Sequence, residues 1–328
     1  MSLHAAPDPM KPSAALCLIN GRACTFLGEG MLFMRWKKFN ADKATFLVIT
    51  IPALALYTFF YIYSVIMGFF YSATNWDGLA RSYDFVGLAN YVKVLSNKRF
   101  FDSTGITLRY ALVMVVGTVV LGVMLAVAIN SIKRFKTFFK SIYFFPAMIS
   151  SVAIALIWDQ VFYRALPNVV SLLGFGGVFK SPLGDRSLAL YAILFVNLWQ
   201  ALAMPTIIFL AGLQSIPNEL YESAVIDGAS MFNQFRYVTL PYLVPTISVN
   251  AILALKGGIT AFDYAFALTG GGPARSTMLI GIKIYQDAFG DTPNFSIANT
   301  EAVLLFLVIA VLSAVQLIVS SKSGVNKA

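Results

Sequence analysis

Charged residues are scarce in this sequence. Only 12% of its 328 residues are Asp, Glu, Lys or Arg, whereas 58% are hydrophobic, and the mean hydropathy is +0.75. A soluble domain carries about 25% charged residues, so there are too few charges here to cover an aqueous surface. The shortage excludes an ordinary soluble protein and indicates a chain embedded in a lipid bilayer.

Histidine and cysteine are also rare, and this limits the chemistry that the chain can perform. The one histidine is His4, and the two cysteines are Cys17 and Cys24, all close to the N-terminus. Neither a Ser/His/Asp nor a Cys/His catalytic set can form in the rest of the chain, and two cysteines are too few for a structural zinc site. Paired acids are missing from the apolar runs. We therefore expect no enzyme activity, no cofactor and no metal on this chain.

The formal net charge of +9 raises the question of nucleic acid as a partner. Binding to nucleic acid would need a basic helix or a basic stripe interleaved with aromatic residues, and neither is present. The basic residues lie in short connections between apolar runs, where they orient membrane spans. We expect the lipid bilayer, and no nucleic acid, as the surrounding partner.

Six apolar runs are long enough to cross a bilayer, which takes about 20 residues. They are Thr45 to Tyr71, Thr107 to Ser131, Ser141 to Tyr163, Leu188 to Leu213, Pro241 to Leu268, and Ala298 to Ser320. The sequence thus predicts an all-α polytopic membrane protein with a tail over 1–44, six transmembrane helices within 45–322, and a short tail over 323–328. We expect no signal peptide, because Ala14 to Ala23 is too short and lacks a clean cleavage pattern. Met31 and Met34 are alternative natural starts.

The distribution of basic residues predicts the orientation of the spans. Six Lys and Arg residues precede the first run, and four lie in the short connection after the second run: Lys133, Arg134, Lys136 and Lys140. Short cytoplasmic connections are enriched in Lys and Arg. Both termini are therefore expected in the cytoplasm, together with the connection between the fourth and fifth runs.

That fourth connection, Leu213 to Tyr242, is the most polar long segment between two apolar runs. Pro217 suits a helix start, and Asn218 to Val225 reads as a short helix. Asp227-Gly228 predicts a break, because Gly tolerates the positive φ that ends a helix. Ser230 can cap a second short helix that stops before Pro241. Two short helices around a glycine predict a rigid protrusion that serves for docking.

The residues of this connection carry a family resemblance. Glu222, Ala224, Gly228 and the ending Val238-Thr239-Leu240-Pro241 resemble the EAA loop of MetI-like permeases, the membrane subunits of binding-protein-dependent ABC importers. Ser223 and Val238 depart from the pattern, where the family has Ala and Ile. In the family this loop inserts into a cleft of the ATP-hydrolysing subunit. The resemblance therefore implies a set of ATPase-coupling residues: Glu222, Ala224, Asp227, Gly228, Ala229, Leu240 and Pro241.

Two further segments are similar to the sugar and oligosaccharide subgroup of these permeases. Phe85 to Tyr91 resembles its F-x-G-L-x-N-Y string, and also reads as a helix lying on the membrane surface with Tyr91, Val94, Leu95 and Phe100. Phe262 to Pro273 resembles its F-D-x-x-x-x-L-T-x-G-G-P segment. The three glycines before Pro273 predict a tight extracellular turn. A phosphate loop is excluded, because the Gly-Lys-Ser/Thr ending is absent.

The resemblance covers about residues 45 to 320 and implies the type I ABC importer permease fold. It also implies partners: a second, similar permease, two cytoplasmic ATPase subunits that hold ATP and Mg²⁺, and a soluble periplasmic or extracellular solute-binding protein. The implied function is transport of a sugar or oligosaccharide across a bacterial inner membrane. The alternative is an ion-gradient-driven secondary transporter or channel, which predicts inverted repeats with interrupted spans. We find no such repeat.

Polar residues inside the apolar runs are candidates for the substrate path, since polar groups in a bilayer face a cavity or a partner. They are Asn197, Trp199, Gln200, Asn250, Lys256 and Asp263. Either they line a path for a sugar, or they form hydrogen bonds that hold the helices together. Asp159 lies near the end of a run, and we expect it to have a structural role in the packing of the helices.

Lys256 is the most unusual of these residues, because sugar permeases generally have a neutral residue here. It lies near the middle of the fifth run, with Asp263 two turns later on the same helix face. Either the two side chains pair, or Lys256 meets an anionic substrate. A uronate oligosaccharide of the alginate type and a glycerol phosphate are two such substrates.

Overall fold

The computed structural model describes residues 41–132, 134, 136–175 and 181–322. These ranges are helical apart from turns and one isolated antiparallel bridge between Thr74 and Phe85, which confirms the predicted all-α class. The tail that holds His4, Cys17 and Cys24 lies outside the described residues, and so does the end at 323–328. Lys133 and Phe135 in the basic connection lie outside them too. The chain separates into two compact units, residues 1–57 and 58–328, which we describe one at a time.

The described part of the first unit is helix α1 (Ala41–Tyr57), which carries Pro52 in its interior. The second unit opens with a π-helical turn, η1 (Thr58–Ile62), and α2 (Tyr63–Ser72). Residues Leu47–Ser72 are long and apolar enough to span a membrane, in agreement with the first predicted run. The side chains along this stretch are largely exposed, as expected for a surface that faces lipid.

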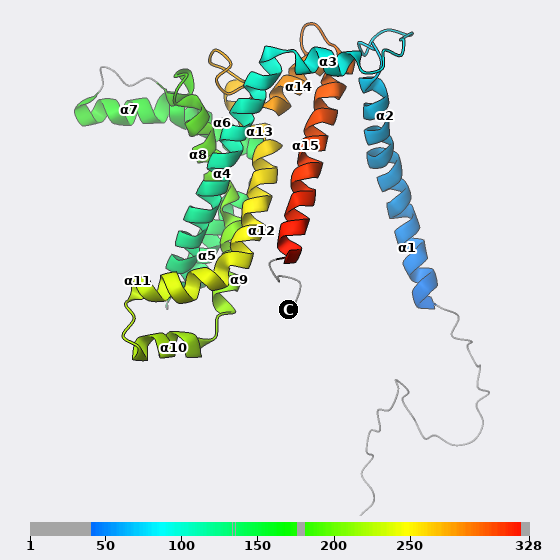
Figure 1. Ribbon diagram of the computed structural model, residues 1–328. Coiled ribbons are helices and arrows are strands. Elements are labelled where there is room, and N and C mark those ends of the chain that lie inside the picture. Colours follow the sequence, from blue (N-terminus) through cyan, green and yellow to red (C-terminus); the bar gives the residue numbers. More distant parts are fainter. Residues whose placement is uncertain (1–40, 133, 135, 176–180, 323–328) are drawn as a thin grey trace, which may run out of the picture. The chain divides into compact units, whose positions relative to one another are not determined.

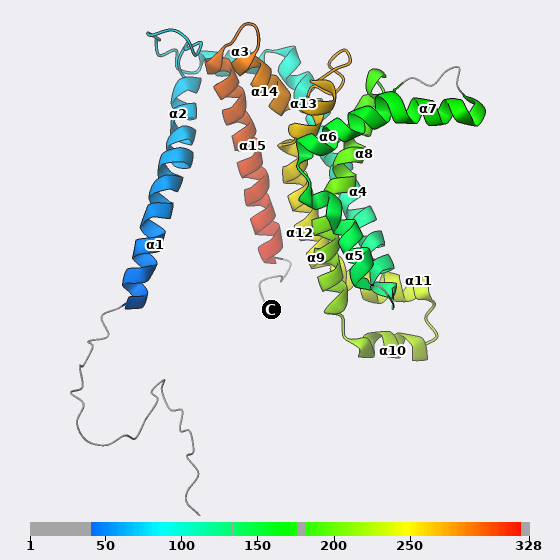
Figure 2. The same ribbon diagram turned by 180° about the vertical axis from the view of Figure 1, so that it is seen from behind.

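Helix α4 (Lys98–Ser131) and helix α12 (Leu240–Ile259) pack against each other in the centre of the second unit (Figures 1 and 2). The contact depends on small residues, as is usual where membrane helices approach closely. A Cβ atom on Gly258 would lie 2.6 Å from Cα of Ala111 on α4. Similarly, Gly122 of α4 faces Phe209 of α9 (Ala203–Gln214), where a Cβ would lie 2.9 Å from the ring. These glycines let the backbones come together.

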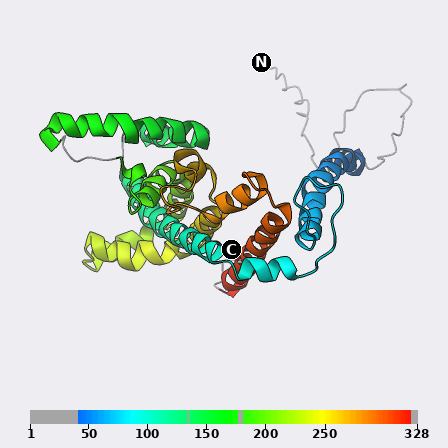
Figure 3. The same ribbon diagram turned by 90° about the horizontal axis from the view of Figure 1, so that it is seen from above.

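Two of the predicted spans are bent. The third begins with α5 (Lys136–Phe144) and η2 (Phe145–Met148) and then turns by 101°. Beyond the turn the chain continues without a break to Gly174, through α6 (Ser151–Gln160), η3 (Val161–Ala165), α7 (Leu166–Val170) and η4 (Ser171–Phe175). The extended backbone at Ile149 and Ser150 makes this turn. The segment with α7 consequently lies crosswise to α12 (Figures 1 and 3).

The fourth predicted span consists of α8 (Ala189–Ala201), which follows η5 (Pro182–Gly184), and α9, with a bend of 50° between the two long helices. Pro205 explains the bend, because its ring excludes the carbonyl of Ala201 four residues earlier and removes one hydrogen bond. Four unbroken helices and these two bent pairs give up to six membrane spans among the described residues. This agrees with the six predicted runs.

The fifth predicted span is wrong in its bounds. The helix begins earlier, at α11 (Met231–Gln234), and runs through η6 (Phe235–Thr239) into α12 without stopping before Pro241. The backbone nitrogen of Pro241 carries no hydrogen, so it cannot donate a hydrogen bond to the carbonyl one turn earlier. The π-helical turn η6 just before it accommodates this missing bond. The helix also ends earlier than expected, at Ile259, and α13 (Asp263–Thr269) is a separate element.

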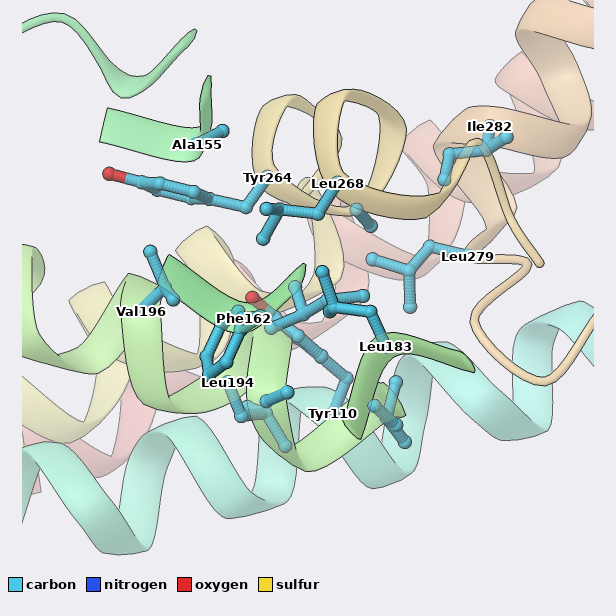
Figure 4. Packing of buried hydrophobic residues seen from close by; sticks show 14 of the residues in the cluster. Tyr110, Ala155, Phe162, Leu183, Leu194, Val196, Tyr264, Leu268, Leu279 and Ile282 are labelled. Carbon is cyan, nitrogen blue, oxygen red and sulfur yellow. The ribbon is translucent and has the colours of Figure 1, made fainter. Parts of the chain in front are cut away.

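The apolar core of the second unit gathers where α4, α6, α8 and α13 meet (Figure 4). The rings of Tyr110 and Tyr264 enter it from α4 and α13, and Leu194 and Leu279 belong to the same cluster. After α13 the chain makes the predicted tight turn, in which Gly270 and Gly271 adopt left-handed φ values of 57° and 93°. Only glycine takes such angles without strain.

The short helix α3 (Ala89–Leu95) after Phe85 faces protein more than the predicted membrane surface. Val94 and Phe100 are buried against Ile280, and Leu95 alone of the four predicted surface residues is well exposed. The Asn90 amide donates 2.9 and 2.6 Å hydrogen bonds to the carbonyls of Ser72 and Thr74, which explains why an amide is needed here. The segment thus ties the end of α2 to the helix that follows it.

Helices α14 (Ile280–Phe289) and α15 (Phe295–Lys322) share a buried ion cluster that the sequence analysis missed. The Lys283 ammonium donates to Asp287, at 2.6 Å, and to Glu301, which is fully buried. Burial lowers the pKa of Lys283, but the hydrogen bonds to Asp287 and Glu301 outweigh it, and the pKa lies above that of a free lysine. The cluster fastens α15 to α14.

We expect Lys283→Met to destabilise the protein strongly. The substitution leaves the Glu301 carboxyl buried without its cation, and breaking a buried ion pair from one side costs roughly 3–5 kcal/mol. Thermal unfolding in detergent should show the loss as a lower midpoint. The double variant Lys283→Met/Glu301→Leu, which removes the charge from both sides, should regain most of the stability. A double variant that is less stable than Lys283→Met would contradict this account of the cluster.

Candidate functional site

Helices α10 (Asn218–Ile226) and α11 form a protrusion at one end of the second unit, as Figures 1 and 2 both show. Helix α10 agrees with the predicted helix to within one residue, although Pro217 lies just before it in extended backbone instead of starting it. We call residues 217–234 the protrusion.

The turn between the two helices favours glycine and is closed by backbone hydrogen bonds. Gly228 has φ +71°, donates to the carbonyl of Val225 at 3.0 Å, and is followed by Ala229, which donates to Ala224 at 2.9 Å. This pair of bonds is the Schellman motif, which satisfies the last carbonyls of a helix. The predicted break at Asp227-Gly228 is thus confirmed.

The second helix of the protrusion is capped as the sequence predicts. The Ser230 hydroxyl accepts from the backbone N–H of Asn233 at 3.4 Å. The Gln234 side chain donates to the carbonyl of Ala229 at 2.9 Å and holds α11 against the turn. Because Pro241 and Leu240 belong to the start of α12, they form the root of the protrusion instead of the end of a loop.

One face of α10 packs on the helix bundle and the other is open. Leu220 and Tyr221 lie against the core formed by α4, α9 and α12, and the Tyr221 hydroxyl is 2.9 Å from the hydroxyl of Thr239. Glu222 and Asp227 are exposed. This anchoring makes the protrusion stiff, as a mechanical connection requires.

The tip of the protrusion presents apolar side chains to the surroundings. Ile226 is 85% exposed and Met231 is 89% exposed, with Val225 and Phe232 beside them in the chain. An apolar patch flanked by polar groups marks a protein contact. The sequence analysis did not identify these four residues as contact residues.

A polar cavity of about 290 Å³ lies within the bundle, away from the protrusion. Its polar and aromatic lining comes from α4, α6, α8 and the segment from α12 to α13: Tyr110, Ser151, Asn197, Gln200, Thr260, Phe262, Asp263 and Tyr264. Three of the six predicted path residues, Asn197, Gln200 and Asp263, are among them. Tyr110, Ser151, Thr260 and Tyr264 were not foreseen.

The break between α12 and α13 builds this cavity. Helix α12 ends at Ile259, and Thr260 closes it with an N–H bond of 3.0 Å to the carbonyl of Lys256. The chain then turns, so that Asp263 at the start of α13 comes within 2.9 Å of the Ser151 hydroxyl on α6. A continuous helix would have carried Asp263 past this position.

Hydrogen bonds fix the cavity walls. The Asn197 amide donates to the Tyr110 hydroxyl at 2.6 Å. The Gln200 amide donates to the carbonyl of Ile149 at 2.6 Å and accepts from the Tyr264 hydroxyl. These amides therefore bridge helices and also line a cavity.

The other predicted path residues lie elsewhere. Lys256 is in the last turn of α12, not near the middle of a span, and it is exposed outside the cavity. Among the described residues, ion pairs within 4.0 Å involve Lys283 alone, so Lys256 and Asp263 do not pair. The early end of α12 is the reason, since the two residues no longer share a helix.

Trp199, Asn250 and Asp159 also lie away from the cavity lining. Trp199 stacks edge-on with Trp158 at 5.7 Å between ring centroids. Asn250 is fully buried and donates to the carbonyl of Thr246 at 3.1 Å, within its own helix. Asp159 is half-buried on α6.

Comparison with known proteins also indicates a membrane transport protein. The sequence profile of the family described as "Binding-protein-dependent transport system inner membrane component" matches residues 118–323. The chain is 45% identical over 278 residues to the multiple sugar-binding transport system permease protein MsmF of Streptococcus mutans, covering 85% of this chain and 94% of that protein. It is 32% identical over 276 residues to the trehalose/maltose transport system permease protein MalF of Thermococcus litoralis, covering 83% and 92%.

A solved structure shows the same fold. It is a chain of a bacterial ABC transporter involved in the import of the acidic polysaccharide alginate, with a TM-score of 0.74 and 22% sequence identity. The match covers 88% of this chain and 98% of that chain. It confirms the predicted fold of a type I importer permease.

Proposed function

Because the chain belongs to the family of inner membrane components of binding-protein-dependent transport systems, we propose that it is the permease subunit of an ATP-driven importer of sugars or oligosaccharides. The single observation that supports ATP-driven transport is the geometry of the protrusion. It is stiff, anchored to the bundle, and ends in exposed apolar residues that need a partner. A separate ATPase subunit on this surface could transmit force to α12, because the protrusion continues into that helix.

We propose the partners that the family resemblance implies. They are a second, similar permease, two ATPase subunits that bind ATP and Mg²⁺, and a soluble solute-binding protein. The end of the bundle with α10 would face the cytoplasm, where ATP is available, and both termini would lie on that side. The coupling residues would be those of the EAA-like loop around Glu222 and Gly228, with Ile226 and Met231 added to them.

The polar cavity supports a sugar as the substrate. It is lined by the amide and hydroxyl groups of Asn197, Gln200 and Thr260 and by the rings of Tyr110 and Tyr264. The polar groups can exchange hydrogen bonds with sugar hydroxyls, and the rings offer apolar faces. The relatives from Streptococcus mutans and Thermococcus litoralis are named for sugar transport.

Within this class we favour a neutral sugar over an acidic one. The expectation of an acidic substrate depended on Lys256, which lies outside the cavity. The Asp263 carboxyl is exposed in the cavity lining. A negative charge there would repel a uronate or a phosphate. The ion-gradient-driven alternative gains no support from the family match.

Transport in proteoliposomes tests this proposal. The complete assembly with its binding protein should take up a neutral oligosaccharide only when ATP is supplied on the side of the ATPase subunits. Uptake of a uronate oligosaccharide in place of the neutral one would overturn the choice of substrate. Uptake that persists without ATP under an ion gradient would overturn the proposed mechanism.

A further inference from the structure

The bend in the third span is held by a side chain from another helix. Between η2 and α6 the residues Ile149 and Ser150 are extended, with ψ of 143° and 137°. Carbonyl groups at such a break lose the N–H partners that a continuous helix would supply. The Gln200 amide of α8 donates to two of them, to Pro146 at 3.1 Å and to Ile149 at 2.6 Å.

The other side of the bend is tied to α13. The hydroxyl of Ser151, the first residue of α6, donates to the Asp263 carboxylate at 2.9 Å. The next residue of α13, Tyr264, donates from its hydroxyl to the side-chain oxygen of Gln200. The hydrogen bonds thus run from α6 through α13 and α8 back to the bend. We call Ser151, Gln200, Asp263 and Tyr264 the clamp.

Every member of the clamp lines the polar cavity of about 290 Å³. A sugar in this cavity would therefore compete for the groups that hold the bend. The competition is sharpest at Gln200, because a side-chain amide has only two N–H hydrogens to donate. The carbonyls of Pro146 and Ile149 accept from this nitrogen. Gln200 can consequently donate to a sugar hydroxyl only by giving up a bond to the bend.

Beyond the bend the helix runs from residue 151 to residue 174, and we call this segment the arm. Its inner end is anchored, since Ile154 and Ala155 belong to the same apolar core as Tyr264. Its outer end is not, since α7 has no buried residue and Leu172 of η4 is 86% exposed. Figures 1 and 3 show α7 lying crosswise to α12. An element fixed at one end beside two extended residues has the form of a hinge.

We propose that Gln200 is a positioning residue that makes the angle of the arm depend on the substrate. Without sugar its amide holds the bend, and a sugar that accepts its hydrogen bonds releases the bend and lets the arm tilt. This inference rests on the proposed function, in which the cavity receives a sugar. A ligand shifts an equilibrium only by its difference in affinity for the two states. Here the difference consists of the bonds to Gln200 that the sugar gains when the bend is released.

Proline at position 150 locks the bend without disturbing it. Ser150 has φ −57°, within the range of about −65 ± 15° that proline allows. Ile149 before it has the extended backbone that a residue preceding proline prefers. Ser150→Pro therefore fits the observed bend and opposes a helical one. Ser150→Ala is the matched control, because it removes the same hydroxyl and leaves the backbone free.

Uptake into proteoliposomes by the complete assembly separates a moving bend from a static one. We expect Ser150→Pro to lower the maximal rate of sugar uptake by about tenfold or more, because a conformational step sets the rate. The sugar concentration for half-maximal uptake should stay within about twofold, and Ser150→Ala should stay within about twofold in both quantities. A static bend would be stabilised by the proline. Normal uptake by Ser150→Pro, or equal loss in Ser150→Ala, would overturn the proposal.

The movement of the arm is measured directly with spin labels on Leu172→Cys of the arm and Leu108→Cys of α4, both exposed positions. The assembly is placed in nanodiscs, and its other cysteines are replaced by serine. Saturating maltose, or another neutral sugar that the wild type takes up, should shift the distance between the labels in the wild type and in Ser150→Ala but not in Ser150→Pro.

Gln200→Met supplies a test that needs no sugar. Methionine has a similar length but cannot donate, so the labels should show the shifted distance before any sugar is added. A wild-type arm that ignores sugar, or a Gln200→Met arm that keeps the wild-type distance, would contradict the role of the clamp. A wild type without ATP-dependent sugar uptake would instead be a failure of the proposed function, and the Gln200→Met distance would still decide whether Gln200 holds the bend.

Discussion

Replacing Gly228 by aspartate is expected to abolish sugar uptake while the protein remains in the membrane. Nothing lies within 4 Å of a Cβ atom at this position, and aspartate tolerates a positive φ better than most residues do. The isolated chain should therefore fold, with a backbone strain of about 1–2 kcal/mol at most. In the assembly, however, a charged side chain would enter the surface that we propose as the contact with the ATPase. A loss of roughly 2 kcal/mol or more at such a contact lowers coupled transport by over about tenfold.

The chain supplies a matched control for this substitution. Gly174 is also exposed, has φ +87°, and has nothing within 4 Å of an added Cβ, but it lies at the end of the α7 segment and not on the protrusion. Gly174→Asp should leave uptake within about twofold of the wild type. Uptake and the amount of membrane-bound protein are measured together for both variants. Normal uptake by Gly228→Asp, or equal loss in both variants, would contradict the coupling role.

Filling the polar cavity is expected to block uptake without unfolding the protein. Gly257 lines the cavity and has open space around an added Cβ, so Gly257→Trp would place an indole in the cavity that we propose as the substrate path. Glycine is also a weak helix former, and its replacement favours α12. Forcing a sugar past a filled site costs about 1–3 kcal/mol or more, which is a factor of about 10 to 100 in the rate. Uptake of labelled sugar into proteoliposomes measures the effect.

Val249→Trp is the control for this prediction. Val249 is on the same helix, is 43% exposed, and does not line the cavity. Its replacement should leave uptake nearly unchanged, and both variants should keep ATP hydrolysis without substrate. If Gly257→Trp transported as well as the wild type, the cavity could not be the path.

The sequence predicted the membrane class, the six apolar runs and the helix–Gly–helix protrusion, because each depends on local information. Run length predicts a span, and Gly228 predicts the left-handed end of α10. The bends in the third and fourth spans were harder to foresee. Pro205 and the extended Ile149–Ser150 pair are local causes, but their effect depends on the neighbouring helices.

The site residues that the sequence missed are set by tertiary packing. Gly257 and Gly258 are the local sign of a break after Ile259, but the apolar residues Ala261 and Phe262 continue the run beyond it, so the run reads as one span. Because of that break, Asp263 comes within hydrogen-bonding distance of Ser151 and lines the cavity, whereas Lys256 lies outside the cavity. Glu301 likewise reads as a lone acid in an apolar run until α14 places Lys283 against it.

Site-directed crosslinking of the protrusion tests the central claim most directly. The chain's own Cys17 and Cys24 are replaced by serine, Met231→Cys is introduced at the exposed tip, and a thiol-linked photocrosslinker is attached in the assembled importer. The account predicts a covalent product between this chain and the ATPase subunit. A tip that is labelled by a membrane-impermeant reagent from outside the cell, or that joins to no subunit, would contradict it.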